Sequence, residues 1–129
     1  MNKKILIADD DPNIRLLIEE TLSELKDNGV ELLLASDGEE AVKLAQMHHP
    51  DVIILDIIMP QKTGYEACEE IRNAPNAGEA FIIMLSGRSS EVTLRTTERV
   101  GANVYIAKPF EPEQLLSTVE EALYRNKKS

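Results

Sequence analysis

Four aspartates occupy positions where several of them could bind one metal ion. Asp9, Asp10 and Asp11 directly follow a short apolar run, and Asp56 follows another. Like charges a few ångströms apart repel, so clustered carboxylates need a cation, a proton or solvent. Mg²⁺ prefers oxygen ligands and is often held by few protein groups, several waters and a substrate phosphate. We therefore expect Asp9, Asp10 and Asp56 to bind Mg²⁺, and Asp11 to cap the helix that follows it.

Asp56 is also a candidate nucleophile. It ends the apolar run Val52–Leu55, and its simplest role there is that of a turn residue, because aspartate favours the start of a loop. Carboxylates can, however, form aspartyl phosphates. A metal beside them neutralises the oxygens of the transferring group and holds it in line. Because Asp9 and Asp10 are expected next to Asp56 and could hold such a metal, the role of nucleophile is favoured over that of a turn residue.

Two further side chains would complete a phosphoryl-binding site. Ser86 follows the apolar run Phe81–Leu85 and offers a hydroxyl to a phosphoryl oxygen. Lys108 follows the run Val104–Ala107 and offers a compact cation. Each is weak evidence alone, because serine and glycine often form turns and most lysines are solvated. Tyr105 is most simply a boundary aromatic with its hydroxyl in water.

Five short apolar runs would position these side chains. They are rich in Ile, Leu and Val with little polar alternation, which is typical of strands buried on both faces of a parallel sheet. The runs are Ile5–Ala8, Glu31–Ala35, Val52–Leu55, Phe81–Leu85 and Val104–Ala107. Ligands of open α/β sheets bind beyond the carboxyl ends of the strands. The acidic, hydroxyl and basic groups should therefore converge on one edge.

Amphipathic segments of helical period lie between the runs. Their apolar faces fall within residues 14–25, 41–48 and 115–123. Capping residues mark three helix starts, namely Asp11, Asp37 and Glu111. Five βα units in succession predict an α/β fold with a doubly wound parallel sheet. No linker or repeat interrupts them, so we expect one domain over residues 1–129.

The segment Ser89–Val100 should be the fourth helix, but its apolar face is thin. It is rich in valine and threonine, and β-branched residues lower helix propensity. The simpler interpretation is a poorly packed surface helix. The alternative is an element that shifts between two states.

Composition narrows the possible partners. The 129 residues are 43% hydrophobic with a net charge of −9, which is globular and disfavours direct binding to nucleic acid or an anionic membrane. The lone cysteine, Cys68, forms no intrachain disulfide and suggests a reducing compartment. No apolar stretch is long enough to span a bilayer. We expect a soluble, cytoplasmic protein.

Four motifs, in order and at these spacings, resemble the receiver domain of two-component response regulators over nearly the whole chain. They are Ile5–Pro12, Leu55–Pro60 with Gly64, Ser86-Gly87, and Gly101–Phe110. The resemblance implies a flavodoxin-like (βα)5 fold with strand order 2-1-3-4-5. It also implies a cis bond between Lys108 and Pro109.

The resemblance assigns roles to the site residues. Asp56 would take a phosphoryl group from a histidine kinase, a phosphotransfer protein or a small phosphodonor. Asp10, Asp56 and the backbone carbonyl of Ile58 would bind Mg²⁺ directly, and Asp9 largely through water. Ser86 and Lys108 would then contact the phosphoryl group.

The resemblance also implies a switch. Tyr105 would turn into the space that Ser86 vacates and reshape a face formed by Ser89–Val100, Tyr105 and Leu115–Leu123, which is a population shift. That face would control a downstream effector protein. The chain is expected to act as a monomer or as a phosphorylation-dependent dimer. By this resemblance the chain would be a signalling switch and not an enzyme, because it would catalyse only its own phosphorylation and dephosphorylation.

Two departures from the commonest family pattern lie after the fourth strand. Gly87 stands where alanine is frequent and should loosen the loop. Arg88 is long and cationic, and it could reach the phosphoryl group or shield it from water. Ser86 stands where threonine is frequent and keeps the hydroxyl.

The residues favour a receiver over three other classes of protein. A haloacid-dehalogenase-type phosphatase needs a second aspartate two residues after the nucleophile, where this chain has Ile58. A flavodoxin-like flavin binder would not place three aspartates in its phosphate loop, because they repel phosphate. A pseudo-receiver that acts only as a binding module would lack some of the key groups, and all are present here.

Overall fold

The computed structural model describes residues 3–74, 79–87 and 91–124. All five strands belong to one parallel sheet, in the order β2-β1-β3-β4-β5, which confirms the predicted fold class and strand order. The strands are β1 Lys4–Ala8, β2 Glu31–Ala35, β3 Val52–Asp56, β4 Phe81–Ser86 and β5 Val104–Ala107. β2 and β5 coincide with their predicted runs, and β1, β3 and β4 are each one residue longer at one end.

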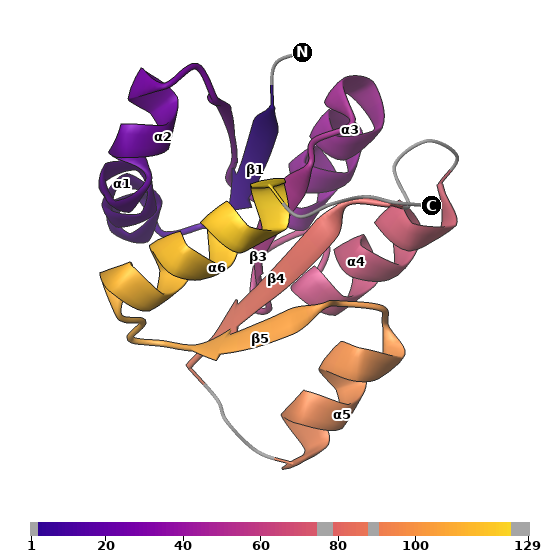
Figure 1. The fold of residues 1–129 in the computed structure, drawn as a ribbon. Helices are drawn as coiled ribbons and strands as arrows, with labels where there is room; N and C mark the ends of the chain where they lie inside the picture. The colour runs from indigo at the N-terminus through magenta and orange to yellow at the C-terminus, as the bar shows by residue number, and fades with distance from the viewer. Residues whose placement is uncertain (1–2, 75–78, 88–90, 125–129) are drawn as a thin grey trace.

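Helices cover both faces of the sheet (Figure 1). They are α1 Pro12–Thr21, α2 Ser23–Asp27, α3 Gly38–His48, α4 Gly64–Asn73, α5 Glu91–Arg99 and α6 Pro112–Tyr124. One core cluster joins the sheet to α3 and α4, through residues such as Ala41 and Ile71. The second joins the opposite face to α1, α2 and α6, through residues such as Ile18, Leu25 and Leu115. The central strands β1 and β3 are therefore buried on both sides, as their unbroken apolar runs predicted.

The segment after β1 differs from the prediction of a single helix. Most of its apolar face is buried, with Ile18 and Leu22 fully covered and Leu25 nearly so, but Leu17 of the same predicted face is 40% exposed. The helix is nevertheless broken at Leu22, whose φ and ψ are −100° and 12°. The hydroxyl of Thr21 donates to the carbonyl of Leu17, a back-bond that often bends a helix. The periodicity revealed the buried face but not the break.

Two of the three predicted caps are formed in the structure. The Asp11 carboxylate accepts a hydrogen bond from the Asn13 amide, and the Asp37 carboxylate accepts one from the Glu40 amide. Leu115 N–H donates to the Glu111 carbonyl at the start of α6, which places Glu111 at the predicted boundary. Among the described residues, no helix is long and apolar enough to cross a membrane.

Candidate functional site

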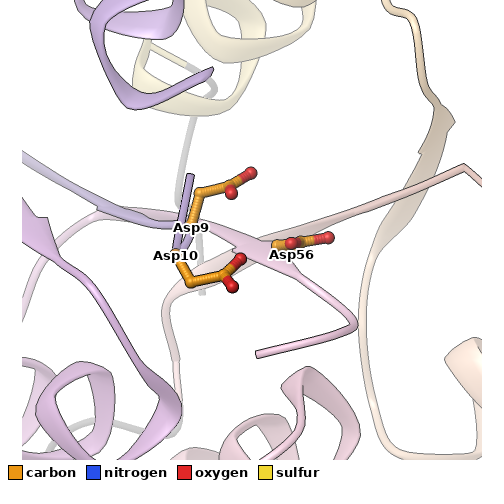
Figure 2. Close-up of side chains that lie close together, drawn as sticks. All are labelled: Asp9, Asp10 and Asp56. Carbon is orange, nitrogen blue, oxygen red and sulfur yellow. The ribbon is translucent and has the colours of Figure 1, made fainter. Parts of the chain in front are cut away.

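The carboxyl ends of the two central strands bring three aspartates together. Asp9 and Asp10 follow β1, and Asp56 is the last residue of β3. Figure 2 shows the three carboxylates extending from the strand ends toward a common space. One oxygen from each carboxylate can be chosen so that all three lie within 4.8 Å of one another. The structure therefore brings together the three aspartates that the sequence predicted as metal ligands.

The three carboxylates differ in exposure and in partners. Asp9 is 1% exposed and Asp56 is 6% exposed, whereas Asp10 is open to solvent. One oxygen of Asp9 accepts the backbone N–H of Asp11 at 2.9 Å. The backbone carbonyl of Asp9 accepts Nη1 of Arg15 at 2.6 Å. These hydrogen bonds fix the position of Asp9. The carboxylates of Asp10 and Asp56 lie close to it.

Lys108 supplies the positive charge of the site. Its Nζ lies 2.9 Å from Oδ2 of Asp9 and 3.3 Å from Oδ1 of Asp56. Burial acts to lower the pKa of Lys108, but the hydrogen bond to Asp9 and the charge of Asp56 outweigh it, and the pKa is raised. The ammonium therefore stays charged at neutral pH. Lys108 is followed by a cis peptide bond to Pro109, as the family resemblance implied.

Asp56 is poorly stabilised as an anion. Burial raises its pKa from 3.8 to about 6, and the negative charge of Asp9 acts in the same direction. The charge and hydrogen bond of Lys108 oppose this rise, and the charge of Asp10 adds a smaller contribution to it. Among the described residues, the Lys108 ammonium pairs with Asp9 and Asp56, and Asp10 adds a third carboxylate beside them.

Ser86 and Tyr105 lie next to each other at the end of β4 and in β5. Ser86 is 3% exposed, and its backbone carbonyl accepts the amide N–H of Lys108 at 2.8 Å. The Tyr105 hydroxyl lies 3.4 Å from that same carbonyl, which is a long hydrogen bond. The expectation that this hydroxyl lies simply in water is therefore incomplete. A cavity of about 360 Å³ adjoins Ser86 and is walled by residues of the loop after β3, of α4 and of α5.

The loop that follows Asp56 joins the site to α4. Ile57 N–H pairs with the Leu85 carbonyl at 3.1 Å, so the strand geometry continues one residue past Asp56. Ile58, the predicted carbonyl ligand, has a side chain that is 60% exposed. Gly64 N–H then donates to the Ile57 carbonyl at 2.7 Å, which seats the start of α4 against the loop.

Several residues that hold this region were not singled out from the sequence. Thr63 and Glu66 form a full capping box at the start of α4, and their spacing is the signal that would have found it. Lys62 forms ion pairs with Glu39 and Glu70, for which no local pattern exists. Arg88, which was considered as a phosphoryl contact, lies outside the residues that the structure describes.

The donor set suits a small, hard cation. Three carboxylates are close enough for one ion to lie between them, and oxygen ligands are what Mg²⁺ takes. The pKa of Asp56 is raised first by burial and then by the charge of Asp9, and Lys108 offsets this only in part. A divalent cation would stabilise the ionised form of Asp56.

The chain belongs to the response regulator receiver domain family. Residues 5–120 match the family described as "Response regulator receiver domain". The match includes β2 to β5, all of β1 except Lys4, and the whole of the acidic site.

Individual relatives agree with this assignment. The chain is 39% identical over 127 residues to a probable transcriptional regulator, ycf27, of Guillardia theta, and the match covers 98% of the chain and 48% of that protein. It spans about half the length of the curated relatives it matches.

Solved structures give the same result. Chemotaxis protein CheY4 of Vibrio cholerae has a TM-score of 0.85 at 36% identity, with 95% of this chain and 100% of that chain covered. The receiver domain of sensor histidine kinase PA1611 from Pseudomonas aeruginosa PAO1 was solved with a magnesium ion coordinated in its active site cleft. It has a TM-score of 0.84 at 30% identity, with 95% and 98% covered. The chain is therefore similar to signalling domains of two-component systems over nearly its whole length.

Proposed function

We propose that residues 1–129 form one receiver unit that is switched by phosphorylation of Asp56. The observation that supports this most is the grouping of Asp9, Asp10, Asp56 and the Lys108 ammonium at one edge of the sheet. The donor would be the phosphohistidine of a histidine kinase or of a phosphotransfer protein. A carboxylate oxygen of Asp56 would attack the phosphorus, and the P–N bond would break as the new P–O bond forms. The imidazole leaves with the electron pair of the broken bond and takes up a proton.

Asp10, Asp56 and the carbonyl of Ile58 would bind Mg²⁺, with Asp9 acting largely through water. When bound, the ion would neutralise phosphoryl oxygens and keep the transfer in line. The magnesium ion in the similar PA1611 domain supports this assignment.

The remaining site groups would bind the phosphoryl oxygens. Lys108 already lies 3.3 Å from Asp56, so a phosphoryl group on that carboxylate is within reach of its ammonium. Ser86 ends the adjacent strand β4, paired through Leu85 with Asp56 itself. A movement of Ser86 toward the phosphoryl group would break the present arrangement around the Tyr105 hydroxyl, which now contacts the Ser86 carbonyl.

The output would leave through the face made by α5, β5 and α6. β5 is an edge strand of the sheet, and Tyr105 within it is only half buried. Tyr105 would turn inward in the phosphorylated state, and the changed face would bind a downstream effector protein. Because the similar ycf27 protein is a probable transcriptional regulator, an effector that acts on transcription is one candidate.

Intact-protein mass spectrometry after incubation with acetyl phosphate tests the proposal. We expect a magnesium-dependent gain of one phosphoryl group that is labile and is absent in Asp56→Asn. Asp11→Asn is a matched control, because asparagine also caps helices and Asp11 has no proposed part in the transfer. Modification that persists in Asp56→Asn, or that needs no divalent cation, would refute the assignment.

A further inference from the structure

The loop between β3 and α4, residues 57–63, contains an unusual turn. Lys62 N–H donates to the Pro60 carbonyl at 2.8 Å and closes a three-residue turn around Gln61. Gln61 has a φ of 70°, which non-glycine residues seldom adopt. Such conformations persist only where the surrounding structure determines them and are common at functional sites. Contacts outside the loop must therefore hold this turn.

The first contact comes from the backbone of α3. Gly38, the first residue of that helix, directs its N–H to the Pro60 carbonyl at 3.4 Å. The Lys62 carbonyl packs so closely on Gly38 that a Cβ atom there would overlap it. The φ of Gly38 is not in the left-handed region, so the glycine is needed for the close approach and not for its own conformation. The turn is thus pressed directly onto the start of α3.

The second contact comes from the Lys62 side chain. Its Nζ lies 2.8 Å from Oε2 of Glu70 on α4 and 3.3 Å from Oε1 of Glu39 on α3. The two helices lie side by side on one face of the sheet (Figure 1). Lys62 is one-quarter exposed, while the two glutamates are about half exposed. The lysine therefore ties the turn to both helices at once.

We propose that Lys62 and Gly38 together position the loop that follows Asp56, so that its Ile58 carbonyl is oriented toward the cation site. The inference rests on the proposed function, because it concerns the same metal site. Asp56 precedes the loop and Ile58 lies two residues before Pro60, whose carbonyl is the anchor point of the turn. If the turn is released, the Ile58 carbonyl loses its fixed orientation relative to Asp56. Lys62 is a positioning residue, and it does not touch the reacting atoms.

The test compares Lys62→Met with Lys43→Met. Lys43 is an exposed lysine of α3 that lines the same groove as Gln61, so the control removes an equal charge from that groove. Magnesium affinity is measured on the full chain by calorimetric titration, and phosphorylation by acetyl phosphate is followed as a function of magnesium concentration. Loss of groups that orient ligands typically weakens metal binding about tenfold or more. We expect a Kd for Mg²⁺ about tenfold higher in Lys62→Met, a Kd within twofold of the unsubstituted chain in Lys43→Met, and recovery of phosphorylation at saturating Mg²⁺.

Gly38→Ala provides an independent variant. Alanine favours helix more than glycine does, so a purely structural effect should leave α3 intact or strengthen it. The added Cβ would nevertheless overlap the backbone of Lys62, which must shift, and we expect both the magnesium affinity and the midpoint of urea unfolding to fall. The affinity is therefore measured under conditions in which the variant is fully folded. Gly38→Ala also decides the question if Lys62→Met does not fold.

The outcomes separate the two proposals. Unchanged Mg²⁺ affinity in both Lys62→Met and Gly38→Ala would overturn the positioning role and leave the proposed function standing. An equal loss in Lys43→Met would also overturn it, because charge alone would then explain the effect. If the unsubstituted chain neither binds Mg²⁺ nor accepts a phosphoryl group, the proposed function fails, and the positioning role fails with it.

Discussion

Asp56 is surrounded by groups that disfavour its negative charge. Burial is the largest cause of the raised pKa of Asp56, and the charge of Asp9 is the second. The Lys108 ammonium offsets this rise only in part. The pKa of Asp56 is thereby about 6 in the folded chain, against 3.8 for an exposed aspartate. The folded state therefore binds a proton more tightly than the unfolded state. Ionisation of Asp56 lowers the free energy of unfolding as pH rises from about 4 to above 6.

Asp56→Asn should consequently stabilise the metal-free protein at neutral pH. The pKa difference corresponds to at most about 3 kcal/mol, and access of water to the site reduces this, so we expect a gain of about 1–2 kcal/mol at pH 7.5. At pH 4 the aspartate is largely protonated in the folded state and the gain should be close to zero. Urea unfolding in the presence of a chelator at both pH values measures the difference.

The exposed residue Asp27 offers a control for this prediction. Asp27→Asn removes the same charge at the end of α2, before the amino end of β2 and not at the carboxyl ends of the strands where Asp56 lies. It should change stability by no more than about 0.5 kcal/mol at either pH. A stabilisation of Asp56→Asn that is equal at pH 4 and pH 7.5 would show that the charge of Asp56 is not its cause.

Residue types and their order were sufficient to predict which groups converge. Asp9, Asp10, Asp56 and Lys108 all follow apolar runs, and parallel strands place such residues on one edge. The contacts that stabilise the turn at Gln61 could not be predicted in this way. It depends on Gly38 and on ion pairs between segments far apart in the sequence, and no local spacing reveals these.

Close packing at the start of α4 has a consequence for stability. Gly64 lies against the backbone of Asp56 so tightly that a Cβ would overlap the Asp56 carbonyl oxygen. Backbone cannot yield as a flexible side chain can, so we expect Gly64→Ala to destabilise the fold by about 2–3 kcal/mol. The better helix propensity of alanine, about 1 kcal/mol, should not compensate. Urea unfolding measures this change.

Gly87→Ala is the matched control at the end of β4. Among the described atoms, none lies within 4 Å of a Cβ built on Gly87. Alanine there should be neutral or stabilise the protein by up to about 1 kcal/mol, by restricting the unfolded chain. Equal stabilities of the two variants would contradict the close approach at Gly64.

Arg72 connects α4 to two segments that flank β4 and β5. Its guanidinium donates to the carbonyls of Gly101 and Ala80, at 2.8 Å and 2.6 Å, and to Oδ1 of Asn103 at 2.7 Å. The same Asn103 oxygen accepts the backbone N–H of Ile82 at 2.8 Å. The arginine thus fixes the turn that ends α5, at the base of the proposed output face.

Arg72→Met should remove these bonds while keeping the apolar stem. Hydrogen bonds to charged groups contribute about 1.5–3 kcal/mol each, and water can replace part of this at a half-buried site. We therefore expect a loss of about 2–3 kcal/mol in urea unfolding and faster hydrogen exchange at the Ile82 amide. Arg72→Lys should show a smaller loss of stability, because one ammonium can make some of these hydrogen bonds but cannot reproduce the planar fork of the guanidinium. An unchanged exchange rate at Ile82 in Arg72→Met would argue against the clamp.

The strands were predicted from the sequence more completely than the helices, and the reason is physical. Buried parallel strands are marked by unbroken apolar runs, and all five were found. The break at Leu22 was missed because the apolar period continues through it, so that burial is the same whether the helix is straight or bent. It depends instead on local hydrogen bonding, including that of Thr21.

The molecule as a whole carries a net charge of −9, and part of that charge is concentrated at the acidic edge of the sheet. A high net charge destabilises a compact state through self-repulsion, and any added salt screens it. Specific binding of a cation to the folded state stabilises by mass action in addition. The two effects can be separated, because only the second requires the carboxylates of the site.

Magnesium should therefore stabilise the protein beyond the effect of ionic strength. At a concentration about ten times Kd, binding at one site raises the free energy of unfolding by about 1.4 kcal/mol. We expect this gain in MgCl₂ over NaCl of equal ionic strength, measured by urea unfolding at pH 7.5. It should disappear in Asp10→Asn and persist in Asp11→Asn, since only Asp10 belongs to the cluster. Equal stabilities in the two salts would mean that screening of the −9 charge accounts for the whole effect and that the acidic edge holds no magnesium site.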